Sequence, residues 1–341
     1  MRLGKTGLLA SRSAFGALPI QRVGADEATR ILRAALDGGI NFYDTARAYS
    51  DSESKIGAAF GGLRDRVIIA TKTQAQNGKS LVLELEKSLS ELRTDYIDIY
   101  QFHLAGKCHS PGEPDGLYDA ALKAKADGRI GHIGLTAHRL DVAIEAAKSG
   151  LYETIQFPLS YLSSGKDLEV VELCAANDVG FIAMKALSGG LVGDVAAAFA
   201  WMRQRGGALP IWGIQRMSEL KEFLALEKSP PALDEAMIAR IEKDRSELSG
   251  NFCRGCGYCL PCPANIDISW IARLPHSLRR LKSEMFTTDE WRAKVELVKD
   301  CVNCGACKSR CPYELDPSKM LGASYDEYQR FIAEWDRSRA V

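Results

Sequence analysis

The first 245 residues alternate between short apolar runs and longer stretches in which apolar residues recur at helical steps. Short runs rich in β-branched and aromatic residues predict buried strands, and apolar residues at steps of three and four predict amphipathic helices. Eight runs have the character of strands: residues 13–17, 41–44, 67–71, 96–101, 132–135, 154–157, 180–184 and 210–213. Each is followed by a helical stretch, for example 25–37, 81–92, 168–176 and 195–205.

This regular alternation is typical of parallel α/β folds. Eight strand–helix units in about 245 residues match the usual size of a closed (β/α)8 barrel, the TIM barrel. The alternative is a doubly wound sheet, which would show a glycine-rich G-x-G-x-x-G turn after an early strand. The sequence contains no such turn. We therefore expect a (β/α)8 TIM barrel over residues 1–245.

Residues 246–341 follow a different pattern. Residues 270–285 and 289–300 have apolar positions at helical steps, and Pro275 interrupts the first stretch. Eight of the ten cysteines also lie in this part of the chain. We expect a second, mostly helical domain that begins near residue 246.

Charge and composition narrow the choice of partner. The chain has 44 basic and 44 acidic residues, so it offers no overall field that would attract a nucleic acid. No apolar run reaches the roughly 18 residues that span a bilayer. The opening residues, MRLGKTGLLA, lack the apolar core of a signal peptide. We therefore expect a cytoplasmic protein with neither a nucleic-acid nor a membrane partner.

The spacing of the cysteines points to metal chemistry. Without a secretion signal, clustered cysteines are better explained as metal thiolates than as disulfides. The first run reads C-x2-C-x2-C-x2-C-P and the second C-x2-C-x2-C-x3-C-P. Consecutive C-x2-C steps wrap one face of a 4Fe-4S cubane, and in two-cluster ferredoxins the cysteine before proline binds the other cluster. The runs contain Cys253, Cys256, Cys259 and Cys262, and Cys301, Cys304, Cys307 and Cys311.

We therefore expect two 4Fe-4S clusters with crossed ligands. One cluster takes Cys253, Cys256, Cys259 and Cys311, and the other takes Cys301, Cys304, Cys307 and Cys262. The first run is one residue shorter before its last cysteine than the ferredoxin pattern. The alternative is a pair of four-cysteine zinc sites, but these usually form from separated C-x2-C pairs.

Polar residues follow three adjacent predicted strands. Asp44 and Tyr49 follow the second strand, Lys72 ends the third, and His103 follows the fourth. In a TIM barrel, catalytic groups lie at the carboxyl ends of the strands. Tyr49 is suited to donate a proton to a carbonyl during hydride transfer if the Lys72 cation favours its ionisation. Asp44 would hold Lys72 and His103 would orient the substrate oxygen, and the reaction would reverse for alcohol oxidation.

Residues 2–8 (RLGKTGL) and 39–46 (GINFYDTA), together with Tyr49, Lys72 and His103, resemble the aldo-keto reductase family. The resemblance covers residues 1–245 and implies a catalytic tetrad of Asp44, Tyr49, Lys72 and His103 with a nicotinamide cofactor across the rim. With the appended cysteines, the chain resembles aldo-keto reductases fused to a ferredoxin-like domain. The spacer between the cysteine runs resembles the helical ferredoxin domain of the fumarate reductase subunit.

The resemblance also implies where the cofactor binds. Thr136, His138 and Gln156 match positions that hold the nicotinamide carboxamide, and Arg216 could pair with a 2′-phosphate. That pairing slightly favours NADP(H) over NAD(H), although Glu219 and Phe223 depart from the family's usual residues. The cofactor-binding set is Thr136, His138, Gln156, Lys185, Leu187, Ser188, Gly190, Gly213 and Arg216.

Three functions fit the sequence. The first is an oxidoreductase that transfers hydride between NAD(P)H and a small carbonyl or alcohol, with the clusters serving electron transfer, redox sensing or structure. The second is a relay that passes single electrons from a ferredoxin or flavoprotein partner to a group in the barrel, because clusters carry one electron and hydride donors carry two. The third is a nucleotide-sensing regulatory subunit, resembling the potassium-channel auxiliary subunits.

Overall fold

The computed structural model describes residues 1–341 except 249–251, 256, 281–282, 312 and 340–341. The described residues form two compact units. The first comprises Met1–Ala186 and Val195–Ile238, and the second comprises Leu187–Asp194 and Ala239–Val341. The boundary expected between residues 245 and 246 falls within helix α9 (Glu235–Leu248). The segment 187–194, which follows a barrel strand in the chain, packs with the second unit.

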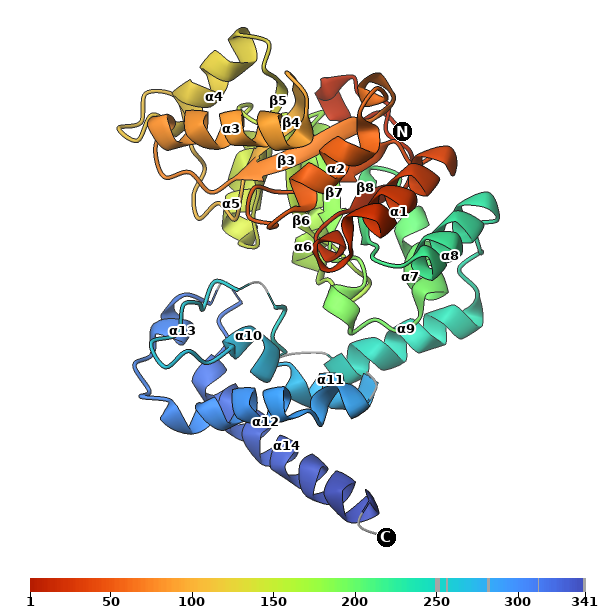
Figure 1. Ribbon diagram of the computed structural model, residues 1–341, viewed down its shortest axis with the longest axis vertical. Coiled ribbons are helices and arrows are strands. Elements are labelled where there is room, and N and C mark those ends of the chain that lie inside the picture. The colour runs from red at the N-terminus through yellow and green to blue at the C-terminus, as the bar shows by residue number, and fades with distance from the viewer. Residues whose placement is uncertain (249–251, 256, 281–282, 312, 340–341) are drawn as a thin grey trace. The chain divides into compact units, whose positions relative to one another are not determined.

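The first unit is a closed barrel of parallel strands, which lie inside a ring of helices coloured red to green in Figure 1. Each strand pairs with its neighbours in chain order, and β8 closes on β1. The strands are β1 (Ala14–Gly16), β2 (Phe42–Asp44), β3 (Ile68–Thr73), β4 (Ile97–Phe102), β5 (Ile130–Thr136), β6 (Thr154–Pro158), β7 (Gly180–Met184) and β8 (Ala208–Gly213). Every predicted strand is present, and the predicted (β/α)8 fold is confirmed.

Helices cover the outside of the barrel because each one buries a single apolar face. In α1 the residues Ile31, Leu32 and Ala35 are fully buried at helical spacing. The helix α3 begins at a capping box, in which the Asn77 side chain accepts a hydrogen bond from the Ser80 amide at 3.0 Å. The barrel helices are α1 (Ala25–Asp37), α2 (Ser52–Phe60), α3 (Gly78–Leu92), α4 (Leu117–Ala126), α5 (Leu140–Lys148), α6 (Gly165–Ala176), α7 (Val195–Arg203) and α8 (Met217–Lys228).

The first ten residues close the amino ends of the strands. The Leu3 amide donates to the Leu8 carbonyl at 3.0 Å, and the Leu3 side chain belongs to a buried apolar cluster that includes Phe42 and Leu209. Gly4 has a φ of +51°, and a Cβ there would lie 2.3 Å from the backbone nitrogen of Gly180. This close approach therefore requires glycine. The apolar plug leaves the carboxyl ends of the strands as the end where chemistry can occur.

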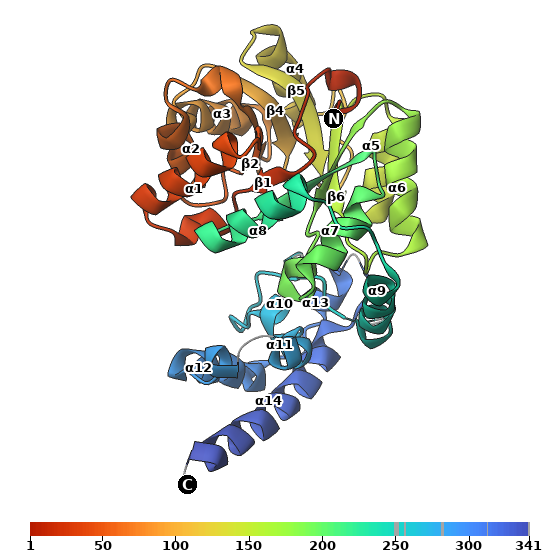
Figure 2. The same ribbon diagram turned by 90° about the vertical axis from the view of Figure 1, so that its right-hand side faces the viewer.

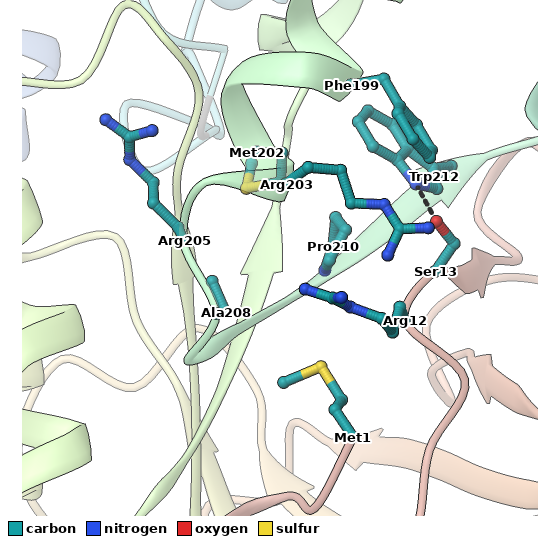
Figure 3. A pocket seen from close by; sticks show the side chains of 11 residues that line it. Met1, Arg12, Ser13, Phe199, Met202, Arg203, Arg205, Ala208, Pro210 and Trp212 are labelled. Atoms are coloured by element: carbon teal, nitrogen blue, oxygen red, sulfur yellow. Dashed lines mark hydrogen bonds between the residues drawn. The ribbon is translucent and has the colours of Figure 1, made fainter. Parts of the chain in front are cut away.

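Figure 3 shows a small hollow near the amino end of β8, lined by Met1 and Ser13 among others. The Trp212 indole nitrogen donates to the Ser13 hydroxyl at 2.9 Å. Trp212 is 1% exposed, and its ring stacks on Phe199 and Phe223 with centroids 5.8 and 4.8 Å away. The hollow is therefore part of the packing of the barrel wall.

The second unit consists of helices and loops in the part of the chain that the structure describes (Figures 1 and 2). Its elements after α9 are α10 (Ile268–Ile271), α11 (Leu274–Arg280), the 3-10 turn η5 (Ser283–Phe286), α12 (Asp289–Glu296), the 3-10 turn η6 (Leu297–Asp300), α13 (Ala306–Ser309) and α14 (Pro317–Arg339). The predicted helical stretch 270–285 is divided into shorter pieces. Pro275 is the second residue of α11, where a backbone N–H is not needed.

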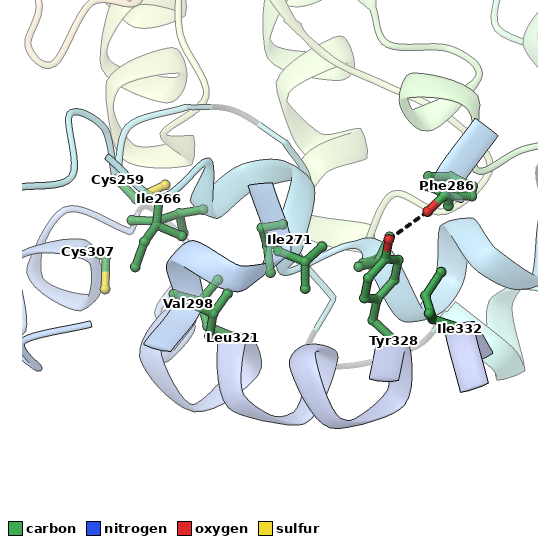
Figure 4. Packing of buried hydrophobic residues seen from close by; sticks show 12 residues of the cluster. Cys259, Ile266, Ile271, Phe286, Val298, Cys307, Leu321, Tyr328 and Ile332 are labelled. Carbon is green, nitrogen blue, oxygen red and sulfur yellow. Dashed lines mark hydrogen bonds between the residues drawn. The ribbon is translucent and has the colours of Figure 1, made fainter. Parts of the chain in front are cut away.

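The long helix α14 provides one side of the core of this unit (Figure 4). Its residues Leu321, Tyr328 and Ile332 recur at helical spacing and pack with Ile271 and Phe286. The Tyr328 hydroxyl donates to the Phe286 carbonyl at 2.7 Å. Among the helices that the structure describes, none is both long and apolar enough to cross a bilayer.

Candidate active site and cysteine sites

The four predicted catalytic residues occupy neighbouring positions at the carboxyl ends of the strands. Asp44 ends β2, Lys72 lies one residue before the end of β3, and His103 follows β4. These three strands pair side by side. Tyr49 lies in the loop between β2 and α2. The structure therefore brings onto one rim the residues that the sequence pattern grouped.

Lys72 and Asp44 form a buried ion pair. The Lys72 Nζ atom donates to Asp44 Oδ2 at 2.7 Å and to the Thr45 carbonyl at 2.5 Å. The two side chains are 1% and 3% exposed. Buried charges need such partners, because removal from water is costly for an isolated ion.

Tyr49 lies close to both the ion pair and His103. The Lys72 Nζ atom is 5.1 Å from the centroid of the Tyr49 ring. The Tyr49 and His103 rings are 5.8 Å apart and meet edge to face at 80°. Among the described residues, neither His103 Nδ1 nor Asp44 Oδ1 has a hydrogen-bond partner, although both atoms are buried. Buried polar atoms normally have partners, so this rim fits a polar ligand or ordered water.

Burial dominates the ionisation of these groups. It raises the pKa of Asp44 against the opposing influence of Lys72. It also raises the pKa of Tyr49, and the Lys72 cation only partly offsets the rise. The expectation that Lys72 favours the ionised phenol is right in sign, but burial outweighs it. Burial and Lys72 together lower the pKa of His103 to about 3. At neutral pH, Tyr49 therefore keeps its proton and His103 is uncharged.

Three further polar residues, on β4, β5 and β6, extend the network. Gln101 Nε2 donates to Gln156 Oε1 at 3.0 Å, and Gln156 Nε2 reaches Asp44 Oδ2 at 3.4 Å. The Thr136 hydroxyl at the end of β5 accepts from the Leu104 amide at 2.9 Å. Gln156 and Thr136 were predicted to hold the cofactor, and both lie on the rim. Gln101 was not predicted as a site residue, although a buried glutamine on a barrel strand is itself a signal.

Glu53 is a further residue that the sequence did not indicate. It is 1% exposed and forms an ion pair with Arg47 in the loop that carries Tyr49. Its other carboxylate oxygen accepts from the Thr71 hydroxyl at 2.6 Å, next to Lys72 on β3. The Arg47 amide donates to the Lys72 carbonyl at 3.0 Å. Glu53 therefore ties the Tyr49 loop to the strand that carries Lys72.

The residues predicted to bind adenosine lie after β8. Gly213 ends that strand, and Arg216 precedes α8 with its side chain 69% exposed. Arg216 Nε donates to Glu219 Oε1 at 2.8 Å, while Glu219 Oε2 accepts from the Arg216 amide at 3.1 Å. The Glu219 carboxylate thus occupies the amino end of α8, where an anion would otherwise be favoured.

The remaining predicted cofactor residues are divided between the two units. His138 is 4% exposed and follows β5 in the barrel, and Lys185 follows β7 with a φ of +60°. Leu187, Ser188 and Gly190 belong by their contacts to the second unit. The structure therefore does not gather the whole predicted set into one compact unit.

The described cysteines of the second unit line two hollows. The smaller one, with about 340 Å³ of space that includes open solvent, is lined by Cys253, Cys259 and Cys311. The larger one, with about 400 Å³ of such space, is lined by Cys259, Cys262, Cys301, Cys304 and Cys307. Cys256, which was predicted as a ligand, lies outside the described residues. No acidic side chain lines either hollow in the described part of the chain.

The spacing of the cysteine sulfurs can be compared with that of a zinc site. Tetrahedral zinc with Zn–S bonds of about 2.3 Å would place its ligand sulfurs roughly 3.8 Å apart. Among the described residues, no three cysteine sulfurs lie within 4.8 Å of one another. In the described part of the chain, the cysteine sulfurs are thus not gathered as tightly as around a single zinc ion.

Comparisons with known proteins agree with both halves of this picture. Residues 13–194 match the model of the aldo/keto reductase family, and residues 252–316 match a 4Fe-4S dicluster domain. One relative is the uncharacterized oxidoreductase YrpG of Bacillus subtilis, with 33% identity over 57% of this chain and 68% of its own. Another is the aldo-keto reductase YhdN of the same organism, with 43% identity over 30% of this chain and 36% of its own.

Solved structures match the barrel. A putative aldo-keto reductase from Pseudomonas aeruginosa has a TM-score of 0.59 and 26% identity, covering 67% of this chain and 93% of its own. An aldo-keto reductase from Klebsiella pneumoniae in complex with NADPH has a TM-score of 0.60 and 22% identity, covering 71% and 93%, a likeness of fold. The chain belongs to the aldo/keto reductase family of oxidoreductases and carries a C-terminal 4Fe-4S dicluster domain.

Proposed function

We propose that the protein reduces a small carbonyl compound with hydride from NAD(P)H and that Tyr49 is the general acid. The supporting observation is the single rim that holds the buried Lys72–Asp44 pair, with Tyr49 and His103 beside it. The relatives include a methylglyoxal reductase of Salmonella typhimurium, 28% identical over 67% of this chain and 92% of its own. Small aldehydes of this class are therefore the first substrates to test.

The protonation states of Tyr49 and His103 determine the role of each side chain in the proposed reaction. The substrate carbonyl oxygen would lie beside the Tyr49 hydroxyl and the His103 imidazole, whose rings are neighbours on the rim. A bound nicotinamide supplies the hydride. As charge develops on the oxygen, Tyr49 donates its proton and Lys72 stabilises the phenolate that remains. Neutral His103 donates a hydrogen bond and fixes the orientation of the oxygen. For alcohol oxidation the same groups act in reverse.

The rim polar atoms support the proposed cofactor contacts. Gln156, Thr136 and His138 would hold the carboxamide, with Gln156 exchanging its contacts to Gln101 and Asp44 for the ligand. Lys185, Leu187, Ser188 and Gly190 would lie over the pyrophosphate, and Gly213 and Arg216 against adenosine. NADPH is the proposed donor, through Arg216. Glu219→Gln should strengthen binding of NADPH but not of NADH, because it releases Arg216 from its internal ion pair.

The two hollows support two clusters with crossed ligands. Cys253 and Cys311 line one hollow, and Cys262 lines the other with three of the four cysteines of the second run, while Cys259 lines both. We assign Cys256 to the first cluster on its spacing alone.

The domains that we propose are residues 1–245 for the reductase barrel and 246–341 for the cluster domain.

One observation favours electron transfer by the clusters as a second function. Cys304, which lines the larger hollow, is exposed, so a cluster bound there would lie at the surface of its domain. Such a position suits exchange of single electrons with a ferredoxin or flavoprotein partner. In a single-turnover assay without nucleotide, dithionite-reduced protein would then convert the carbonyl substrate. If substrate is unchanged while the clusters stay reduced, the relay function is excluded.

A substitution of the proposed acid tests the main proposal. Tyr49→Phe should lower kcat for carbonyl reduction by about a thousandfold, the scale of general acid catalysis, with iron content unchanged. Tyr96→Phe is a matched control, because Tyr96 precedes β4 at the opposite end of that strand from His103. Wild-type rates in Tyr49→Phe would remove Tyr49 from the mechanism.

A further inference from the structure

Arg273 joins the loop after β7 to the first cysteine run. It lies between α10 and α11 and is 8% exposed. Its Nη2 atom donates to the Ser188 carbonyl at 3.2 Å and to the Gly189 carbonyl at 2.9 Å. Both acceptors belong to the segment Leu187–Asp194, which follows a barrel strand in the chain but packs within the cluster unit. These bonds fix a loop that we proposed to contact the cofactor pyrophosphate.

Two glycines make room for the guanidinium group. A Cβ at Gly189, where φ is +65°, would lie 3.1 Å from Arg273 Nη2. A Cβ at Gly255, where φ is +62°, would lie 2.6 Å from Nη1. The guanidinium is therefore enclosed between the loop after β7 and the backbone of the first cysteine run. Since both glycines have left-handed backbone conformations, this close contact depends on residues without a side chain.

The same group lies close to the first cysteine site. Gly255, whose backbone the guanidinium approaches, is two residues from Cys253 in the chain. Cys253 lines the smaller hollow and itself accepts from the Gly255 amide at 3.4 Å. One-electron reduction of a cluster bound to Cys253 would add a negative charge near the guanidinium. The added attraction would compete with the bonds to Ser188 and Gly189, because one buried group serves both sides.

We propose that Arg273 is a positioning residue that couples the redox state of the Cys253 cluster to nucleotide affinity through the loop 187–194. The inference rests on the proposed cofactor site. Reduction of the cluster loosens the loop 187–194 and weakens binding of the nucleotide pyrophosphate. Reoxidation of the cluster restores the loop and the affinity. The cluster takes its electron from an external one-electron donor, and no covalent bond forms or breaks. The device would release nucleotide when the clusters are reduced.

The test uses a nucleotide that cannot itself exchange electrons. 2′-Phospho-ADP-ribose keeps the adenosine and pyrophosphate of NADPH but lacks the nicotinamide. Its Kd for the anaerobic holoprotein should rise about fivefold on reduction with dithionite, the lower end of typical coupling between sites. Because coupling is reciprocal, saturating ligand should shift the midpoint potential of that cluster by about −41 mV, at ~59 mV per tenfold for one electron.

Variants of Arg273 test whether this residue connects the cluster to the nucleotide. Arg273→Gln should abolish both the change in Kd and the shift in potential at unchanged iron content. The control Arg254→Gln removes the same charge from the same cysteine run, where Arg254 lies over the Tyr313 ring, and should keep both effects. If Arg273→Gln fails to fold, Arg273→Lys is the second test. It keeps the charge but not the forked donor, so it should weaken the coupling.

The outcomes separate the two proposals. If wild-type protein binds phospho-ADP-ribose equally in both redox states, the coupling is absent while the proposed nucleotide site stands. If it does not bind the ligand in either state, the proposed nucleotide site is wrong. If the coupling persists in folded, iron-replete Arg273→Gln, or is undiminished in folded, iron-replete Arg273→Lys, the role of Arg273 is wrong.

Discussion

The Nζ atom of Lys72 lies 2.7 Å from Oδ2 of Asp44, and both side chains are almost fully removed from solvent. The pair links the ends of β2 and β3 and places a cation beside the Tyr49 ring. A buried pair of this kind is expensive to break, because either partner alone becomes an uncompensated charge. The same ion pair therefore contributes to the stability of the barrel and to the proposed chemistry of Tyr49.

Removing one partner of the Lys72–Asp44 pair should lower the free energy of unfolding more than removing both. Asp44→Asn or Lys72→Met alone should lower the free energy of unfolding by about 3 kcal/mol, the lower end of the cost of breaking a buried pair. The double variant should recover much of that loss but remain inactive, since Tyr49 no longer has its cation. Chemical denaturation checks this. The exposed pair Lys123–Asp127 is the control, and its removal should cost about 0.5 kcal/mol. Additive losses in the buried pair would contradict the account.

The pH profile of carbonyl reduction should lack a histidine inflection. The pKa of His103 is lowered to about 3, so His103 is already neutral throughout pH 6–9. The pKa of Tyr49 is raised, so the acid keeps its proton until alkaline pH. We expect kcat/KM to stay flat from about pH 6 to 9 and to fall only above that range. An inflection near pH 6.5 that disappears in His103→Gln but persists in His132→Gln would contradict these protonation states.

Loss of the Glu53 contacts should loosen the loop that carries Tyr49. Glu53→Gln removes the ion pair to Arg47 but keeps an acceptor for the Thr71 hydroxyl. We expect kcat to fall about tenfold with little change in KM, because misplacement of a proton donor affects the chemical step more than binding. Glu27→Gln, at an exposed pair with Arg30, should leave kcat unchanged. Equal effects of the two substitutions would exclude a positioning role for Glu53.

Crossed ligation predicts which cysteines share a cluster. Cys311→Ala should perturb the same EPR signal as Cys253→Ala, because these residues line the same hollow. It should leave the signal perturbed by Cys301→Ala unchanged, although Cys301 and Cys311 belong to the same run. The control Cys174→Ala removes a buried cysteine of α6 and should affect neither signal. If Cys311→Ala and Cys301→Ala perturb one common signal, the ligands are not crossed.

The sequence predicted the barrel well because its signals are local. Apolar runs such as residues 67–70 predict buried strands, and polar residues that follow them, here Thr71 and Lys72, predict the rim. The predicted set Asp44, Tyr49, Lys72 and His103 depends on three consecutive strands, whose carboxyl ends meet in any parallel barrel. Their protonation states were less predictable, because burial outweighs the neighbouring Lys72 cation at Tyr49.

Contacts between distant segments could not be predicted in this way. Arg273 and Ser188 are 85 residues apart, and nothing in either local pattern pairs them. Glu53 resembles an ordinary acidic residue in the first turn of α2, and only the fold shows that it is buried against Thr71. The stretch 270–285 has a helical period throughout, and this local pattern gave no sign of the break between α10 and α11, which both contact α14.

The central claim is that hydride passes directly from the nicotinamide to the carbonyl carbon. The most direct measurement follows deuterium from NADPH labelled at C4 into the alcohol product by mass spectrometry, with anaerobic protein and a panel of small aldehydes. The account predicts one deuterium per alcohol from the transferable position, and loss of this transfer in Tyr49→Phe at unchanged iron content. Alcohol that forms in stoichiometric amount without deuterium would contradict it and would instead identify the clusters as the electron source.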